Sequence, residues 1–459
     1  MRIAVPAVML CALACVAAAA GLPADDSGAD DAAAGASTAG KVSAAQRVVV
    51  AEQAFLTFLD AHGGLAVVES GLDERYLGRD LREWTSLADA GRHLLDTDLA
   101  ATRDLVLPRG DAQAVAAMRA SLVALATEDE TSGAPGPSCA GARDRSLGYG
   151  ALRAALVACY VEYGNKLEFE GGTIDRGSAL QLLHVVDEPA QRKALFDSFL
   201  PLWRALYGNG GLDTSPYRRM IAMAAAEAAK HGSEIDAAAR ALGVGSADVE
   251  RWLVDILDAW RQASDSGMVE PWDYRYVNGV ANRELAARIP GDALMRVNER
   301  FYRHLGADLA RLQVMFDLEP RQGKSPIAYT DFVMRGRESG GRWRASTARV
   351  VGTYPAGGLF PLNELVHESG HAVHVSAIHN RPAYMDWPDT LFTEAFADVP
   401  SWSVYEPAWQ DRYLGGAVDE STSVRALFGD VMLDVTWALF ELRLLRDPAT
   451  DPNLLWTEI

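Results

Sequence analysis

Hydrophobic residues recur at helical spacing along most of the chain. Four stretches place an apolar side chain about every 3.6 positions, at residues 48–59, 114–126, 249–263 and 294–312. This spacing puts the apolar side chains on one face of a helix, and that face is buried when helices pack together. From about Ser43 onward, the pattern therefore predicts a mainly α-helical protein.

Two stretches carry a strand pattern instead. Residues 167–174 read LEFEGGTI, and residues 342–354 read RWRASTARVVGTY between the turn-forming segments GRESGG and PAGG. The second stretch leads directly into a histidine-rich segment, so it predicts a small sheet beside that segment. It is either an ordinary hairpin strand or an edge that can bind an extended peptide, with Ala348, Val350 and Gly352 as candidate contacts.

The first 42 residues differ in composition from the rest of the chain. Residues 1–20 contain one arginine, then an apolar run, then small residues, which is the pattern of a secretory signal peptide. Cleavage after Ala20 or after Ala24 fits equally well. Residues 21–42 are small, acidic and of low complexity, which predicts a disordered linker before a folded body at residues 43–459. We therefore expect an exported protein, located in the periplasm or outside the cell.

The net charge, the hydropathy and the cysteines limit the classes of protein to which this chain can belong. The formal net charge of −19 argues against a nucleic-acid partner, which usually requires a basic surface. After the signal peptide, no stretch has the length and apolarity of a membrane span. A lipoprotein anchor at Cys15 is indicated only weakly, because Ala12 stands where leucine is usual.

Two cysteines, Cys139 and Cys159, remain after removal of the signal peptide. They predict either one disulfide or two buried thiols. None of these features indicates an oligomeric state.

A dense histidine motif stands out at residues 367–374, which read HESGHAVH. On a helix, His367, His371 and His374 form one stripe. The opposite side carries the residues that would pack against the body of the protein: Leu362, Leu365, Ser369, Ala372, Val373 and Ser376. Packing therefore explains one side of this helix and leaves the histidine stripe without a packing role.

The spacing of the motif suits a metal ion. His367 and His371 are four positions apart, so their imidazoles can bind one ion from a single helix face. Glu368 projects about 100° from His367 and reaches the rim of the same site. In a site of the H-E-x-x-H type, the two histidines hold zinc and the glutamate takes a proton from a water molecule.

A catalytic zinc usually has three protein ligands, so a third one is needed. Glu394 follows His371 by 23 positions (394 − 371), and Asp398 lies one helical turn after Glu394. Glu394 would complete a set of two histidines and one glutamate, and Asp398 could then accept the second N–H of a ligand histidine. Asp398 could instead be the third ligand, or both could form a solvated helix face. His374 is expected to be structural rather than a ligand.

At this point the motifs resemble two families of zinc peptidases. NELVHESGHAVH is similar to the zinc helix of thimet-oligopeptidase-like peptidases, which matches Gly370 and His374. TEAFADV is similar to the third-ligand helix of the angiotensin-converting-enzyme-like peptidyl-dipeptidases, and this alignment implies that Glu394 is the ligand and Asp398 its neighbour. The oligopeptidase alignment would instead place Asp398 in the ligand position. We prefer Glu394, because the E-x-x-x-D spacing gives both residues a role.

The resemblance covers residues 340–405 and extends more weakly back to about residue 165, including EPWDYRYVNG at 270–279. It implies a mainly helical, two-lobed body with a deep channel, a small sheet beside the site, and one Zn²⁺ per chain on the channel floor. It also implies hydrolysis of short peptides, as an oligopeptidase or a dipeptidyl carboxypeptidase.

The resemblance has one departure. In these families, tyrosine and histidine residues far beyond the zinc helices bind the substrate and stabilise the oxyanion. This chain ends at Ile459, 88 residues after His371 (459 − 371), so we expect a body that lacks its C-terminal part. The alternative function is therefore a catalytically impaired or truncated zinc-binding homologue that acts as a peptide-binding scaffold.

Overall fold

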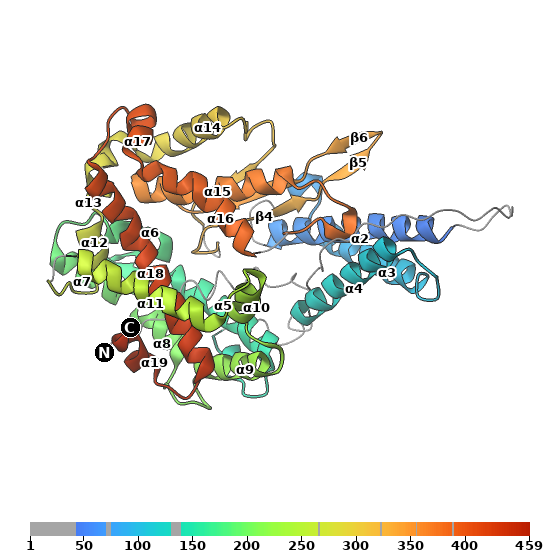
Figure 1. The fold of residues 1–459 in the computed structure, drawn as a ribbon, viewed down its shortest axis with the longest axis horizontal. Helices are drawn as coiled ribbons and strands as arrows, with labels where there is room; N and C mark the ends of the chain where they lie inside the picture. The colour runs from blue at the N-terminus through green and yellow to red at the C-terminus, as the bar shows by residue number, and fades with distance from the viewer. Residues whose placement is uncertain are drawn as a thin grey trace.

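The computed structural model describes residues 43–69, 75–129, 139–264, 267–321, 324–354, 356–387 and 390–459. Within these residues the protein is mainly α-helical with a few small sheets, as the sequence predicts (Figure 1). The predicted signal peptide and linker lie outside the described residues. None of the described helices combines the length and the apolarity needed to cross a membrane.

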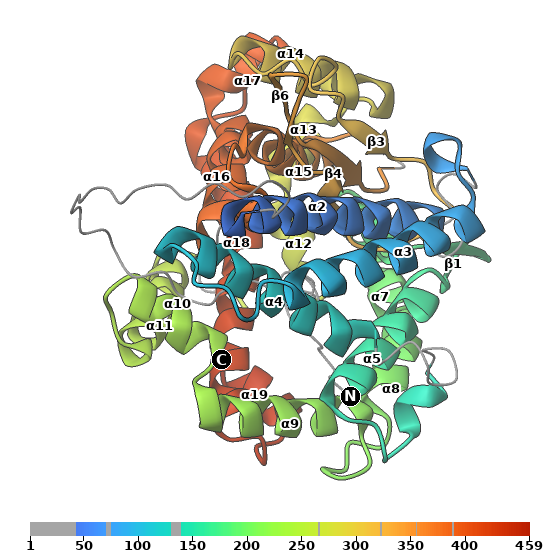
Figure 2. The ribbon, with the colours of Figure 1, turned by 90° about the vertical axis from the view of Figure 1, so that its right-hand side faces the viewer.

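Helices α2 to α11 form one side and the lower part of the molecule (Figure 1). Figure 2 shows the first three helices crossing the front of the molecule, between an upper and a lower group of elements. These three are α2 (Ala44–Glu69), α3 (Leu81–Ala100) and α4 (Arg109–Asp129). The helices that follow are α5 (Tyr149–Gly164), α6 (Arg176–Leu183), α7 (Pro189–Asp197), α8 (Leu200–Tyr207), α9 (Pro216–His231), α10 (Glu234–Ala241) and α11 (Ser246–Ala263).

The remaining helices build most of the upper group, but α18 runs down to the lower group, where α19 also lies (Figures 1 and 2). They are α12 (Tyr274–Asn278), α13 (Val280–Leu285), α14 (Leu294–His304), α15 (Leu359–Ala377), α16 (Thr390–Trp402), α17 (Pro407–Leu414), α18 (Glu420–Arg446) and α19 (Pro452–Glu458). Helix α18 packs against α12 and α13 and also against α9 and α11, so it ties the two groups together.

A three-stranded sheet lies against α15. Its order is β3 (Met315–Asp317), β7 (Thr347–Val351), β4 (Tyr329–Met334), with β7 parallel to β3 and antiparallel to β4. Two short antiparallel hairpins complete the strands: β1 (Leu167–Phe169) with β2 (Gly172–Ile174), and β5 (Arg337–Ser339) with β6 (Arg342–Arg344). The predicted small sheet beside the histidine helix is therefore present.

The strand details differ from the prediction in two ways. Residues 167–174 form a hairpin instead of one strand, because the chain turns at Glu170 and Gly171, which both have positive φ. Residues 342–354 contain two strands, β6 and β7, that belong to different sheets. Both stretches are therefore divided. The first is divided by a turn, and the second by a change from one sheet to another.

The candidate substrate contacts Ala348, Val350 and Gly352 are wrong. Ala348 and Val350 lie on β7, the central strand, and their side chains are fully buried; Val350 is paired on both sides, with Phe316 of β3 and Thr330 of β4. The amide of Gly352 donates to the Asp317 carbonyl at 3.0 Å, and its carbonyl accepts from the Lys324 ammonium at 2.7 Å. An extended ligand could not pair with this strand, and β4 is an outer strand of the sheet instead.

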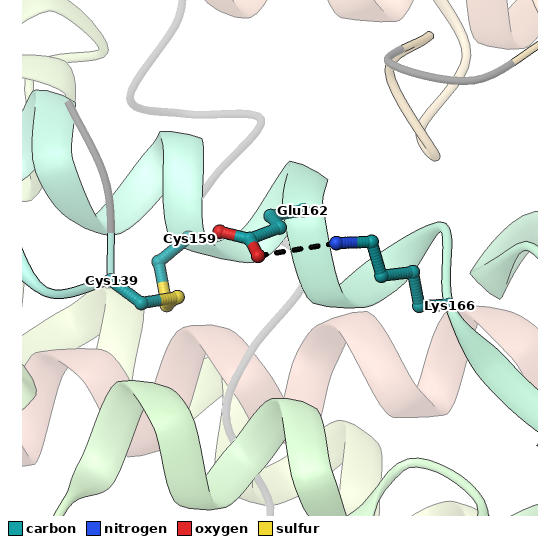
Figure 3. Close-up of a disulfide and its surroundings, with 4 residues drawn as sticks. All are labelled: Cys139, Cys159, Glu162 and Lys166. Atoms are coloured by element: carbon teal, nitrogen blue, oxygen red, sulfur yellow. Dashed lines mark hydrogen bonds and ion pairs between the residues drawn. A yellow bond between two sulfur atoms is a disulfide. The ribbon is translucent and has the colours of Figure 1, made fainter. Parts of the chain in front are cut away.

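A disulfide joins Cys139 to Cys159, so the first of the two predicted alternatives is correct (Figure 3). Cys159 is fully buried on α5, and the two Cα atoms lie 4.5 Å apart. The bond fixes the segment before α5 to the apolar cluster that α5 shares with α8 and α9. It therefore anchors the lower group and not the histidine helix.

Candidate metal centre

Helix α15 carries the histidine motif through the centre of the largest apolar cluster. Leu362, Leu365 and Ala372 are fully buried, as the helical pattern predicts. Gly370 explains how a second helix comes so close. A Cβ atom at this position would lie 2.9 Å from Ala397 Cα, which is shorter than real Cβ contacts, so only glycine allows α16 to approach this near. The approach brings the carboxylates of α16 to the histidines of α15.

Three predicted ligands converge at this contact. His367 Nε2 and His371 Nε2 lie 3.0 Å apart, and Glu394 Oε2 lies 3.4 Å and 3.5 Å from these two nitrogens. Ligand atoms at zinc bond lengths around a tetrahedral ion are separated by about 3.3 Å. Across the described ranges, these three residues form the one group of acidic, histidine or cysteine side chains close enough to hold a metal ion.

Asp398 lies on the other side of the first histidine. Its Oδ1 is 3.0 Å from His367 Nδ1, so the carboxylate accepts the Nδ1–H proton. In the neutral ring, this contact would leave the lone pair of His367 Nε2 directed at Glu394 and His371. The geometry therefore distinguishes the two carboxylates: Glu394 lies near both Nε2 atoms, whereas Asp398 contacts Nδ1 of His367.

The hydrogen bonds and charges of this group favour a positive charge on His367. Burial on its own would lower the pKa of His367, but the hydrogen bonds to Asp398 and Glu394 and the charge of Glu368 raise it to about 10. Burial would raise the pKa of Glu394, but the hydrogen bonds to His367 and His371 hold it far below its ordinary value. Without metal, the cluster therefore keeps a proton that a metal ion would replace.

Glu368 is buried next to the ligands. Its carboxylate accepts a hydrogen bond of 2.7 Å from the hydroxyl of Thr330 on β4. Burial raises the pKa of this carboxyl, while the positive charges of His367 and His371 act in the opposite direction. One helical turn earlier, burial and the charge of Glu368 raise the pKa of Glu364 to about 7.

His374 is buried outside the ligand group. Its ring contacts three aromatic rings, with centroid distances of 5.8 Å to Trp387, 5.4 Å to Phe392 and 4.9 Å to Phe396. Trp387 also meets the ring of His371 at 5.7 Å. The predicted structural role of His374 agrees with this position, since its ring fills an aromatic cluster behind the two ligand histidines.

The sequence did not indicate two residues near this site. Thr330 touches Glu368 from a strand 38 positions earlier, and no motif marks it. Asp434 on α18 is close enough to the site that its pKa, raised to about 6 chiefly by burial and by Asp430, also responds to Asp398 and His367. Both residues reach the site through long-range packing, which a local pattern does not encode.

A cavity of about 1070 Å³ lies at the first turn of α15. Its walls include residues of α5 and α6, the segment 356–358, and Phe360 and Pro361. Phe360 and His367 lie on the same face of α15, because seven positions are close to two turns. None of the three predicted ligands lines the cavity.

The chain was compared with known families, curated proteins and solved structures. No family model matches it, and no curated protein matches it. It is similar to the structure of PZ peptidase A with an inhibitor, at 15% identity and a TM-score of 0.49, over 91% of this chain and 78% of that one. It is also similar to a putative oligoendopeptidase F, at 14% identity and a TM-score of 0.47, with the same coverages. Similarity of this size identifies no activity, so the function has to be inferred from the residues of the chain.

Proposed function

We propose that this protein is a zinc-dependent peptidase that hydrolyses short peptides. The observation that carries the proposal is the convergence of His367 Nε2, His371 Nε2 and Glu394 Oε2 within 3.0–3.5 Å of one another, beside the buried Glu368. Two imidazole nitrogens and a carboxylate oxygen are a usual ligand set of catalytic zinc. The three separations are close to the roughly 3.3 Å expected between ligand atoms of a tetrahedral zinc ion, which supports the proposal.

Each residue of the proposed site would have a separate role in the reaction. His367, His371 and Glu394 would hold the zinc, and Asp398 would fix the ring of His367 through Nδ1. When bound, the ion would polarise the scissile carbonyl and lower the pKa of water toward neutrality. Glu368 would take a proton from the attacking water and pass it to the leaving amine.

Short peptides are the proposed substrates, in either oligopeptidase or dipeptidyl carboxypeptidase mode. The support is the resemblance of NELVHESGHAVH and TEAFADV to zinc helices of peptidases. We also propose an exported location, in the periplasm or outside the cell. The disulfide between Cys139 and Cys159 supports it, because disulfides persist in oxidising compartments.

The test is the variant Glu368→Gln, assayed with a library of quenched fluorescent peptides. We expect turnover to fall by about 10²–10⁴-fold, the usual contribution of a general base, while zinc content stays at one per chain. Glu284→Gln is the matched control, since Glu284 is exposed on α13. Full turnover in Glu368→Gln would show that this residue is not the base.

Hydrolysis and zinc-binding assays of the wild-type protein distinguish the peptidase from the scaffold alternative. Hydrolysis that stops with a chelator and returns with zinc supports the peptidase. Stoichiometric zinc and peptide binding without hydrolysis would instead support the scaffold alternative. Absence of bound zinc after exposure to the ion would exclude both and leave a structural helical protein with a chance motif.

A further inference from the structure

One hydroxyl group contacts the buried carboxylate of Glu368. Thr330 Oγ1 lies 2.7 Å from Glu368 Oε2 and 2.9 Å from the carbonyl oxygen of the same residue. A hydroxyl has one proton to donate. The carbonyl already accepts the helical hydrogen bond from the amide of Ala372, whereas no second donor to the carboxylate is found in the described part of the chain. The Thr330 proton therefore belongs to the carboxylate.

Thr330 is held firmly in place. It lies on β4 opposite Val350 of the central strand β7, and Val350 is fully buried. The neighbouring side chain of Tyr329 accepts a hydrogen bond from Arg349 on the other face of the sheet, as the alternation of a strand requires. Threonine is β-branched, so its first side-chain torsion has few accessible values. The hydroxyl is thus a fixed point provided by the sheet.

Glu368 needs such a fixed point. A glutamate side chain has three torsions, and the carboxylate sits between the ligand histidines and the sheet. A bond to Oε2 removes the freedom of the terminal torsion and leaves Oε1 available to accept a proton. Outer hydrogen-bond partners of this kind usually change the activity of metal sites by about 10–100-fold.

We propose that Thr330 is a positioning residue, whose hydroxyl orients the Glu368 carboxylate for proton transfer. The inference rests on the proposed function, because only a catalytic Glu368 requires this orientation. It assigns a role to the sheet that the histidine motif does not specify. Thr330 on the outer strand β4 orients the carboxylate of Glu368, while α15 and α16 carry the proposed metal ligands.

The variant Thr330→Val removes the hydroxyl and keeps the shape and the strand propensity of the side chain. We expect kcat to fall by about 10–100-fold, with KM within about twofold of wild type and zinc content unchanged. Thr330→Ser keeps the hydroxyl and should recover kcat to within about threefold. Thr347→Val, on β7 of the same sheet, is the matched control and should behave as wild type.

A second readout does not depend on activity. In the metal-free protein, Thr330→Val should lower the thermal unfolding midpoint, because Glu368 loses its donor. In a Glu368→Ala background the same substitution should have a smaller effect, since the bond to the carboxylate is already absent and only the contact with the backbone carbonyl remains. Equal shifts in both backgrounds would mean that the two side chains are not coupled, and would overturn the inference.

The outcomes separate this inference from the proposed function. A wild-type protein that hydrolyses peptides and a Thr330→Val variant with unchanged kcat would overturn the inference alone. Equal losses in the valine and serine variants would also overturn it, because packing and not the hydroxyl would then matter. A wild-type protein that binds zinc but does not hydrolyse peptides would overturn the proposed function, and the positioning role with it.

Discussion

His367 Nδ1 and Asp398 Oδ1 lie 3.0 Å apart, across the contact between α15 and α16. When the ring is neutral, the bond keeps its proton on Nδ1, and it directs Nε2 toward Glu394 and His371. It also gives the two acidic residues of α16 different contacts. In the proposed metal centre, Glu394 would complete the ligand set and Asp398 would orient His367.

The substitution Asp398→Asn should therefore weaken zinc binding without removing it. The amide cannot accept the Nδ1–H proton as strongly as the carboxylate, so we expect the zinc affinity to fall by about 10–100-fold. Competition against a chromophoric chelator measures this change. Asp411→Asn, at an exposed position on α17, is the matched control and should keep the wild-type affinity. An unchanged affinity in Asp398→Asn would contradict the assigned role.

The proton held by the metal-free cluster gives a second prediction. His367 has a folded-state pKa of about 10, so it is protonated at neutral pH when no metal is present. Zinc requires the neutral imidazole, and binding should release about one proton per chain at pH 7–8. Titration calorimetry in buffers with different ionisation enthalpies measures this number. No proton release would mean that His367 is neutral before the metal arrives.

The same pKa determines how the metal-free protein responds to alkaline pH. The folded-state pKa of His367 lies above the ordinary value of 6.5, so its contribution to stability is complete below that pH and is lost as pH rises toward 10. The thermal midpoint should therefore fall between pH 7 and pH 10. In His367→Asn this part of the decrease should be smaller, and an identical decrease would contradict the shifted pKa.

Local periodicity accounts for the part of the site that the sequence predicts. His367 and His371 are paired by the pitch of one helix, and Glu394 and Asp398 by the pitch of another, so each pair can be found from spacing alone. From the sequence, Glu394 was the preferred third ligand and Asp398 remained an alternative. The approach of α16 at Gly370 settles their arrangement, because it places only Glu394 near both Nε2 atoms.

Long-range pairing accounts for the part that was missed. Strand β7 was predicted as a strand, but its central place in the sheet depends on partners that no spacing reveals. Ala348 and Val350 were therefore assigned to an edge that does not exist. Thr330 has no motif of its own, and its contact with Glu368 follows only from the register of β4 with β7.

Gly370 offers a test of the contact that builds the site. In Gly370→Ala, the added Cβ would meet Ala397 Cα at 2.9 Å and Tyr302 Oη at 3.1 Å, so α15 and α16 must separate. Overpacking of this kind costs about 1–3 kcal/mol, and the separation should also weaken zinc binding. Unfolding and chelator competition measure the two effects. Gly148→Ala, where an added Cβ meets nothing within 4 Å, is the control.

The disulfide should stabilise the fold without affecting the metal centre. Cys139 and Cys159 are 20 positions apart, and closing a loop of this length stabilises a protein by about 3 kcal/mol. The bond belongs to the cluster of α5, α8 and α9, whereas the ligands belong to the cluster around α15. Replacing both cysteines with serine should lower the unfolding midpoint and leave zinc affinity unchanged. A matching loss of zinc affinity would show that the two groups of helices are coupled, which their separate apolar clusters do not predict.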